Sequence, residues 1–271
     1  MHALLTHPAI QAVLAPFLIA LLTAELLQRL RLSGLAIIAG LAITIYLVSS
    51  FSLVPLNSTR KIVWIGLASG LLTIPLILLN WAFWRPILTV LAASAAVWVT
   101  WHALLSHPTA TAIQWGLGCA LYLGWLVFWM DDLQDSPVRA ASAGMALGLG
   151  TGMTIMLTGA TVLGKFDLAV GSAAAAYLFI MFVSNSHLPS GRSLTLPLTL
   201  VAGLTACFIV LTSKLPWYTL VVLGVIPLAA KLPVSEQSPV WVQATLLSAA
   251  TLACAVAGIY FSWHIYGLGL L

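Results

Sequence analysis

Charged residues are scarce in this chain. Only 6% of its 271 residues are Asp, Glu, Lys or Arg, whereas 62% are hydrophobic. An ordinary soluble domain has about 25% charged residues. Ten basic and six acidic side chains cannot solvate the surface of a soluble domain of this size. The composition therefore excludes a water-soluble protein and predicts one that resides in a lipid bilayer.

The chain also lacks the motifs of familiar enzymes and cofactor sites. It contains no GxSxG, HExxH, P-loop or dinucleotide-binding motif, so we expect neither an enzyme nor a bound cofactor. Cys119, Cys207 and Cys254 have unrelated spacings, which favours core packing over a disulfide framework or a CxxC metal site. The ten basic residues are scattered singly, so we expect no nucleic acid partner despite the net charge of +4.

Charged residues separate apolar runs that are long enough to cross a membrane, which takes ~20 mainly apolar residues. The run at 86–130 has room for two helices, because a polar segment with Pro108 interrupts it. The first run lacks the basic n-region of a signal peptide, so we expect it to be retained. The sequence predicts an all-α polytopic membrane protein with about ten transmembrane helices, near 9–28, 34–54, 62–80, 85–104, 112–130, 139–163, 168–186, 194–213, 216–230 and 239–264.

Two stretches of the chain resemble each other. TAELLQRLRLSGLAIIAG occupies 23–40, and GATVLGKFDLAVGSAAAA occupies 159–176. Chance similarity between helices rich in Leu, Ala and Gly is the alternative. The spacing favours two five-helix halves, 1–135 and 136–271, joined in one integrated membrane domain. With an odd number of helices in each half, the second half enters the membrane from the opposite side, which predicts a 5+5 inverted repeat.

Ten short helices in a five-plus-five repeat resemble the drug/metabolite transporter superfamily in architecture, over the whole chain but without a diagnostic motif. The resemblance implies cytoplasmic termini. The basic residues favour the opposite, with both termini outside, because the side rich in Lys and Arg faces the cytoplasm. Six follow odd-numbered predicted helices (Arg29, Arg31, Arg85, Arg139, Arg192 and Lys231) and four follow even-numbered ones (Arg60, Lys61, Lys165 and Lys214). The compact, loop-poor design is typical of a bacterial inner (plasma) membrane protein.

Small and polar residues within the apolar helices suggest a pathway and its moving parts. Glycines four residues apart let helices approach closely, and prolines interrupt helices at sites that transporters use for binding. The packing or hinge candidates are Gly144, Gly148, Gly152, Gly171, Pro75, Pro197 and Pro227. The substrate-pathway candidates are Thr151, Thr154, Thr158, Tyr177, Asn185 and Gln114. Each polar candidate has the alternative role of an interhelical hydrogen bond.

No ionisable residue is predicted to lie clearly at the centre of the membrane. Glu25 comes closest to the interior and is expected to pair with Arg29 one turn later, which argues against proton coupling through a buried carboxylate. The acids at 131, 132 and 135 are interpreted as a solvated connector, with attraction of a divalent cation or of a basic partner as the alternative. Five histidines are predicted on the face of the N-terminus as weak metal-ligand candidates: His2, His7, His102, His107 and His264.

The favoured function is transport of a small neutral or weakly polar solute between the two halves. The alternative is a non-catalytic membrane subunit that packs in a larger membrane protein complex, for which the abundance of small residues and the lack of soluble domains are equally suited. Expected partners are the lipid bilayer and either a second copy of the chain or other membrane subunits.

Overall fold

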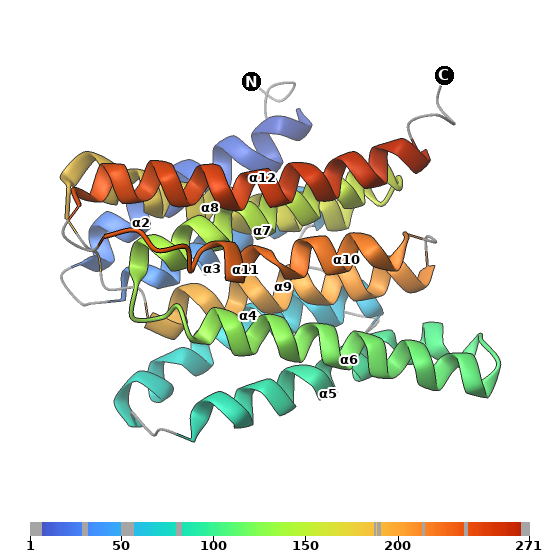
Figure 1. The fold of residues 1–271 in the computed structure, drawn as a ribbon. Helices are drawn as coiled ribbons and strands as arrows, with labels where there is room; N and C mark the ends of the chain where they lie inside the picture. Colours follow the sequence, from blue (N-terminus) through green and yellow to red (C-terminus); the bar gives the residue numbers. More distant parts are fainter. Residues whose placement is uncertain are drawn as a thin grey trace.

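The computed structural model describes residues 7–28, 32–49, 57–79, 83–186, 188, 191–212, 215–235 and 238–266, which are helical nearly throughout and contain no strand (Figure 1). The elements are η1 (Ile10–Leu14, a π-helix), α2 (Ala15–Leu27), η3 (Ser33–Leu35, a 3-10 helix), α3 (Ala36–Ser49), α4 (Ser58–Leu79), α5 (Trp84–Leu105), α6 (Thr109–Asp131), α7 (Pro137–Leu157), α8 (Thr161–Ser184), α9 (Gly191–Thr212), α10 (Trp217–Gly224), α11 (Ile226–Ala229) and α12 (Val240–Tyr266).

Seven of these helices are long and apolar enough to cross a membrane, namely Ile10–Leu27, α5, α6, α7, α8, α9 and α12. By that criterion the chain is an integral membrane protein. The helices at 33–48 and 217–229 are apolar but shorter, and α4 has Arg60 and Lys61 in its first turn. A helical segment lies at each of the ten predicted ranges, but ten complete crossings stay a prediction.

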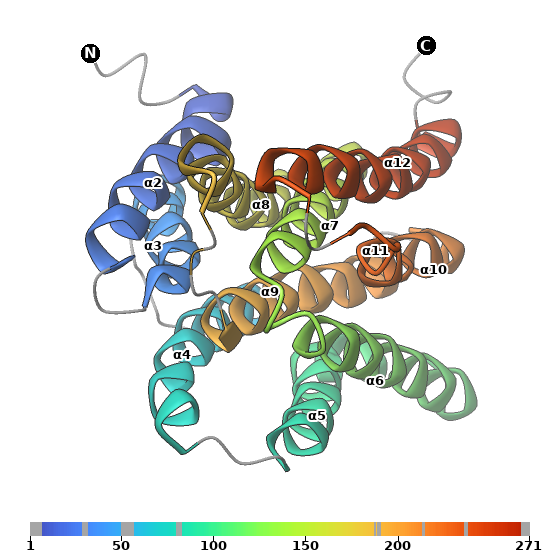
Figure 2. The same ribbon diagram turned by 60° about the vertical axis from the view of Figure 1, so that its left-hand side comes forward.

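The centre of the molecule consists of α7, α8 and α9. In their most apolar stretches 78%, 78% and 94% of residues are buried, against 28–33% for α2, α5, α6 and α12. Figure 2 shows these three helices in the middle, with α2, α3 and α4 on one side and α5, α6, α10 and α12 on the other. Helix α9 therefore contacts both flanks, packing on α4 and on α6.

Glycines bring α7 and α8 into backbone contact. A Cβ added to Gly148 would lie 2.5 Å from the Cα of Gly171, and one added to Gly152 would lie 2.9 Å from the carbonyl oxygen of Gly164. Gly144 packs on Leu198 of α9 instead. The predicted glycine spacing thus coincides with a backbone contact between two helices, while a hinge role stays a prediction.

The contacts between helices match an inverted repeat only in part. The pair α2–α3 packs as α7–α8 does, and α5–α6 corresponds to α10–α12. Helix α7, however, packs extensively on α12, and among the described residues α2 and α6 make no comparable contact. The 5+5 repeat and the two halves therefore remain a prediction.

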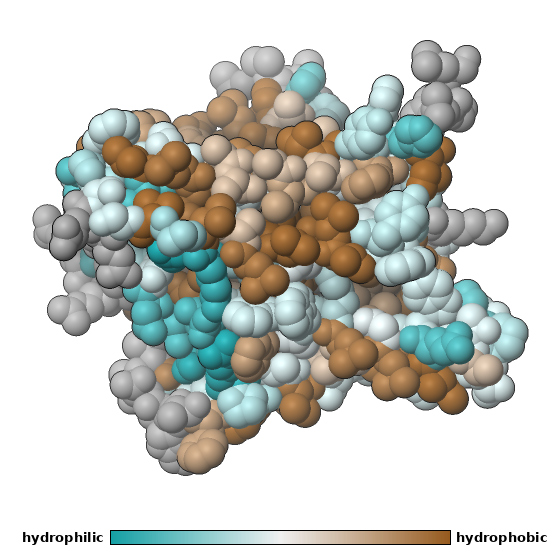
Figure 3. Space-filling model, in the orientation of Figure 1, coloured by the Kyte–Doolittle hydropathy of each residue, from teal (hydrophilic) through white to brown (hydrophobic). Residues whose placement is uncertain are grey.

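Apolar side chains cover the flank of the molecule and polar side chains collect at its ends. Figure 3 shows brown side chains along α12 and the helices beneath it, and teal ones gathered toward the left, where α6 ends. Leu26, Phe83 and Leu121 are 73–76% exposed, as expected for side chains that face lipid. We call the left end of Figure 1 the aspartate end, because α6 ends there with Asp131 and Asp132.

Candidate functional site

Two of the predicted pathway residues lie in the protein interior. Thr151 and Thr154 of α7 are 1% and 0% exposed, and their hydroxyls have no hydrogen-bond partner among the described residues. Thr151 follows Gly144 and Gly148 by seven and three positions, so it shares their face of α7, toward α8 and α9. Thr158 lies just beyond the helix and donates a hydrogen bond to the carbonyl of Ile155 at 2.8 Å.

Of the other three predicted pathway residues, Tyr177 is also buried but its hydroxyl is bonded to a connection, and Asn185 and Gln114 are exposed. Tyr177 donates a hydrogen bond to the carbonyl of Leu188 at 2.9 Å, in the connection that follows α8. Asn185 ends α8 with a φ of 47° and accepts a hydrogen bond from the backbone N–H of Val240 at 3.0 Å. Gln114 is exposed on the outer face of α6. Residue type alone did not distinguish a polar group that fixes a connection from one in the interior.

The prolines have unequal positions. Pro75 is exposed on α4, whereas Pro197 is buried within α9. Pro227 begins α11, directly after the chain breaks the helix at Val225. At this break the carbonyl of Gly224 accepts a hydrogen bond from Nε1 of Trp125 in α6, at 3.0 Å. An indole from a neighbouring helix thus satisfies a carbonyl at the interrupted helix.

A buried carboxylate that sequence analysis placed outside the helices is central to the structure. Helix α8 begins at Thr161 instead of near 168, so Asp167 falls inside it with 0% of its surface exposed. With a rise of 1.5 Å per residue, Asp167 lies about 9 Å from the start of the helix. Asp167 is thus a buried ionisable residue within an apolar helix, which sequence analysis did not identify.

Asp167 has one hydrogen-bond partner among the described residues. The hydroxyl of Thr205 in α9 lies 2.9 and 2.8 Å from the two carboxyl oxygens. Lys165 lies two residues before Asp167 and points to the opposite side of α8, since its ammonium donates to Oε1 of Gln11 at 3.0 Å. In the described part of the chain the Asp167 carboxyl thus has no cationic partner.

Further polar groups line the contact between α6 and α9 near this site. Sγ of Cys207 lies 3.7 Å from the carbonyl oxygen of Cys119, and Sγ of Cys119 lies 4.0 Å from that of Cys207. One turn further along α6, the buried hydroxyl of Tyr122 has no hydrogen-bond partner among the described residues. We use the name Asp167 cluster for the bonded pair Asp167 and Thr205 together with the unpartnered hydroxyls of Tyr122 and Thr151, which lie on α6 and α7, the helices that pack on α9 and α8.

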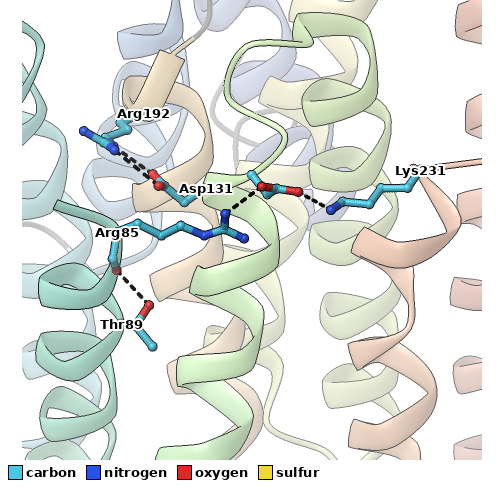
Figure 4. A network of polar contacts seen from close by, with 6 residues as sticks. Arg85, Thr89, Asp131, Arg192 and Lys231 are labelled. Carbon is cyan, nitrogen blue, oxygen red and sulfur yellow. Dashed lines mark hydrogen bonds and ion pairs between the residues drawn. The ribbon is translucent and has the colours of Figure 1, made fainter. Parts of the chain in front are cut away.

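The aspartate end has a network of ion pairs that ties α5, α6, α9 and the segment after α11 together (Figure 4). Asp131 is 5% exposed and pairs with Nε and Nη2 of Arg192 in α9, at 2.8 and 3.3 Å. Asp132 accepts hydrogen bonds from Arg85 of α5 at 2.7 Å and from Lys231 after α11. The expectation of a solvated connector is therefore wrong for Asp131, which is buried against Arg192, whereas Asp132 is exposed and also pairs with cations from distant segments.

The ion pairs at the aspartate end lower the pKa of Asp132 and place two cations over aromatic rings. The hydrogen bond from Lys231 and the charge of Arg85 hold the pKa of Asp132 below its ordinary value, although partial burial opposes them. The two cations also cover aromatic rings, with Arg85 3.7 Å from the ring centre of Phe128 and Lys231 4.1 Å from that of Trp129. Next to Asp131 lies a small cavity between α6 and α9 that is too narrow to hold a water molecule.

The histidines do not form a metal site in the described structure. His102 and His264 occupy the last turns of α5 and α12, while His7 and His107 lie in connections. No three His, Cys, Asp or Glu side chains come together within the described ranges, and His2 lies outside them.

No protein-family model, no curated protein and no solved structure matches the chain.

Proposed function

We propose that the protein moves a small neutral or weakly polar solute across the membrane along the contacts that α9 makes with α6 and with α8. The observation that carries this proposal is the Asp167 cluster. An ionisable side chain inside a membrane-spanning helix is expensive, and such residues usually line substrate or ion routes. Buried hydroxyls without partners are likewise costly, so Tyr122 and Thr151 are suited to hydrogen bonds with a transient ligand.

Polar groups also occur along α9 between this cluster and the aspartate end. Thr195 and Thr199 are 2% and 1% exposed and line the cavity beside Asp131. Thr205 follows further along the same helix and contacts Asp167. The succession of hydroxyls provides hydrogen-bonding groups in an otherwise apolar interior, which supports a route for a neutral solute with few polar groups.

The interrupted helix beside this route supports the same proposal. Secondary transporters commonly place binding sites at broken helices, whose free backbone groups face a cavity or a neighbouring helix. Here Gly224 of α10 lies against Tyr122 of α6, with an added Cβ only 3.4 Å from Cε2 of the ring. The break between α10 and α11 thus lies next to Tyr122, one of the unpartnered hydroxyls.

Uptake into proteoliposomes tests the proposal. We would measure entry of radiolabelled neutral solutes graded in polarity, from glycerol to small aromatic alcohols, into vesicles with and without the protein. Thr151→Val should reduce the flux of the transported solute, and Gln114→Ala on the outer face of α6 is the matched control. Equal leak in protein-containing and protein-free vesicles for every solute would contradict the proposal.

A packing role in a larger membrane complex is the second candidate, and one surface favours it. An apolar groove of about 340 Å³ opens between α7, α8 and α12 and is lined by Phe179, Phe182 and Met145, among others. Purification in mild detergent separates the two functions. Constant co-migration with other subunits would favour the complex, whereas a stable protein alone or as a dimer favours transport.

A further inference from the structure

We propose that Asp167 carries an exchangeable proton and that its loss and return are coupled to solute movement. This proposal deepens the proposed function and rests on it for the coupling, but the proton site itself is tested separately below. It follows from how little the surroundings of Asp167 offer to a negative charge.

An ionised carboxylate at this position is poorly stabilised. Two carboxylate oxygens have about four lone-pair sites for hydrogen bonds, and a buried charge is stable only when it is paired or fully hydrogen-bonded. Asp167 is 0% exposed, and one hydroxyl, that of Thr205, reaches both of its oxygens. A hydroxyl has a single proton, so it satisfies one lone pair at a time.

No charged group on a neighbouring element, within the described ranges, stabilises a negative charge on Asp167. The elements packed against α8 are η1, α2, α3, α7, α9 and α12. Their titratable and charged groups within the described ranges are Glu25, Tyr46, Arg139, Arg192, Cys207, Cys254, Tyr260, His264 and Tyr266. None of these hydrogen-bonds or ion-pairs with Asp167, whose one partner among the described residues is Thr205. On α8 itself, Lys165 is engaged by Gln11.

The protonated acid, in contrast, fits its surroundings. The hydroxyl oxygen of Thr205 lies 2.9 Å from the carbonyl oxygens of both Val201 and Ala202, as well as near Asp167. A carboxylic acid O–H at Asp167 can therefore donate to Thr205, which in turn donates to a carbonyl of its own helix. Each proton in this series of hydrogen bonds has an acceptor, so the arrangement suits a neutral carboxylic acid.

Release of the proton needs a second arrangement in which water or solute reaches the carboxyl. The O–H bond of Asp167 then breaks, a new O–H bond forms on a water molecule, and the carboxylate is left with its negative charge. Tyr122 and Thr151 supply hydroxyls without partners among the described residues, which would hydrogen-bond the incoming water or solute. The reverse transfer restores the neutral acid and permits the close α8–α9 contact to reform.

Infrared spectroscopy of the purified protein in lipid tests the proton site without any knowledge of the solute. The wild type should show the carbonyl stretch of a protonated carboxylic acid at neutral pH, and Asp167→Asn should lose that band. Thr205→Val should keep the band and move it to higher frequency, since one hydrogen bond is lost. Transfer to D2O should shift the wild-type band within minutes, as the proton exchanges.

Three results would overturn the proton site. These are the absence of the band in the wild type, its persistence unshifted after hours in D2O, and its disappearance when NaCl is added at constant pH, which would indicate a metal cation site. Thermal melting establishes that Asp167→Asn is folded, and Thr205→Val gives an independent readout of the same group.

Flux measurements then separate the proton site from transport. In proteoliposomes an imposed pH gradient should stimulate solute uptake by the wild type, and Asp167→Asn should lose that stimulation. A wild-type uptake that is indifferent to the gradient contradicts the coupling. An exchanging infrared band without any solute flux would refute the proposed transport function while leaving the proton site intact.

Discussion

Replacement of Gly148 by alanine should destabilise the protein, because the added methyl group has no space at the α7–α8 contact. The new Cβ would lie 2.5 Å from Cα and 2.6 Å from N of Gly171, and 2.9 Å from the carbonyl oxygen of Asp167. Carbon atoms in van der Waals contact are about 3.5–4.0 Å apart, so the two helices must separate by roughly 1 Å. The obstructing atoms belong to the backbone, so no side-chain rotation relieves the contact.

The magnitude follows from measured effects of overpacking, which cost about 1–3 kcal/mol. A change of 1 kcal/mol shifts Tm by roughly 2–4 °C in proteins of this size range, so Gly148→Ala should lower Tm by about 2–12 °C. Thermal melting in detergent, followed by circular dichroism, measures the shift. The infrared band of the Asp167 side chain should change as well, because the main-chain carbonyl of Asp167 lies at the contact that the methyl group displaces.

Gly118→Ala is the matched control. Gly118 lies exposed in the interior of α6, and a Cβ added there would meet no atom within 4 Å. An alanine in a helix interior is about 0.5–1 kcal/mol more favourable than glycine, so this variant should melt at or slightly above the wild-type temperature. Equal melting temperatures for Gly148→Ala and Gly118→Ala would show that α7 and α8 are not in backbone contact.

Three further predictions concern the other contacts. Arg192→Gln leaves Asp131 buried without its cation and should lower the free energy of unfolding by about 3–5 kcal/mol. The double variant with Asp131→Asn should recover most of that loss. A double variant no more stable than the single one contradicts the pairing. Because the pKa of Asp132 is lowered in the folded state, its carboxylate stabilises the fold above about pH 4, and this stabilisation is lost as pH falls through the folded pKa. For a pair this exposed the stabilisation is at most about 1 kcal/mol. The Tm difference between wild type and Asp132→Asn should therefore vanish at pH 2 and persist at pH 7. Trp125→Phe removes the donor to Gly224 and should cost about 1–3 kcal/mol, measured against Trp101→Phe on the exposed side of α5, and the two variants melting alike would count against that hydrogen bond.

Local patterns were sufficient to locate the helices and the tight glycine contact. An apolar run of suitable length becomes a helix in lipid whatever its neighbours are, because its backbone has no other hydrogen-bond partners there. Glycines spaced four apart similarly define one smooth stripe on α7 without reference to α8. The break between α5 and α6 at Pro108 could also be predicted from the local sequence, because it depends only on the residues around the proline.

Contacts between distant segments could not be predicted in this way. KFD at 165–167 interrupts an apolar run and was interpreted as a connection, yet the helix continues through it. It does so because Lys165 meets Gln11 on one side and Thr205 meets Asp167 on the other. The aspartates after α6 were misjudged for the same reason, since their cations come from α5, α9 and the segment after α11.

The backbone contact of α7 with α8 determines where the molecule is able to move. Two helices whose main chains touch at Gly148 and Gly171 have little room to slide or tilt against each other, so we expect them to move together as a rigid pair. Sliding is left to contacts made through side chains, such as that of α8 with α9. The Asp167–Thr205 hydrogen bond crosses this boundary, with the acid on one body and the hydroxyl on the other. Displacement of α9 from the rigid pair therefore breaks that bond and bares the acid to water in a single event.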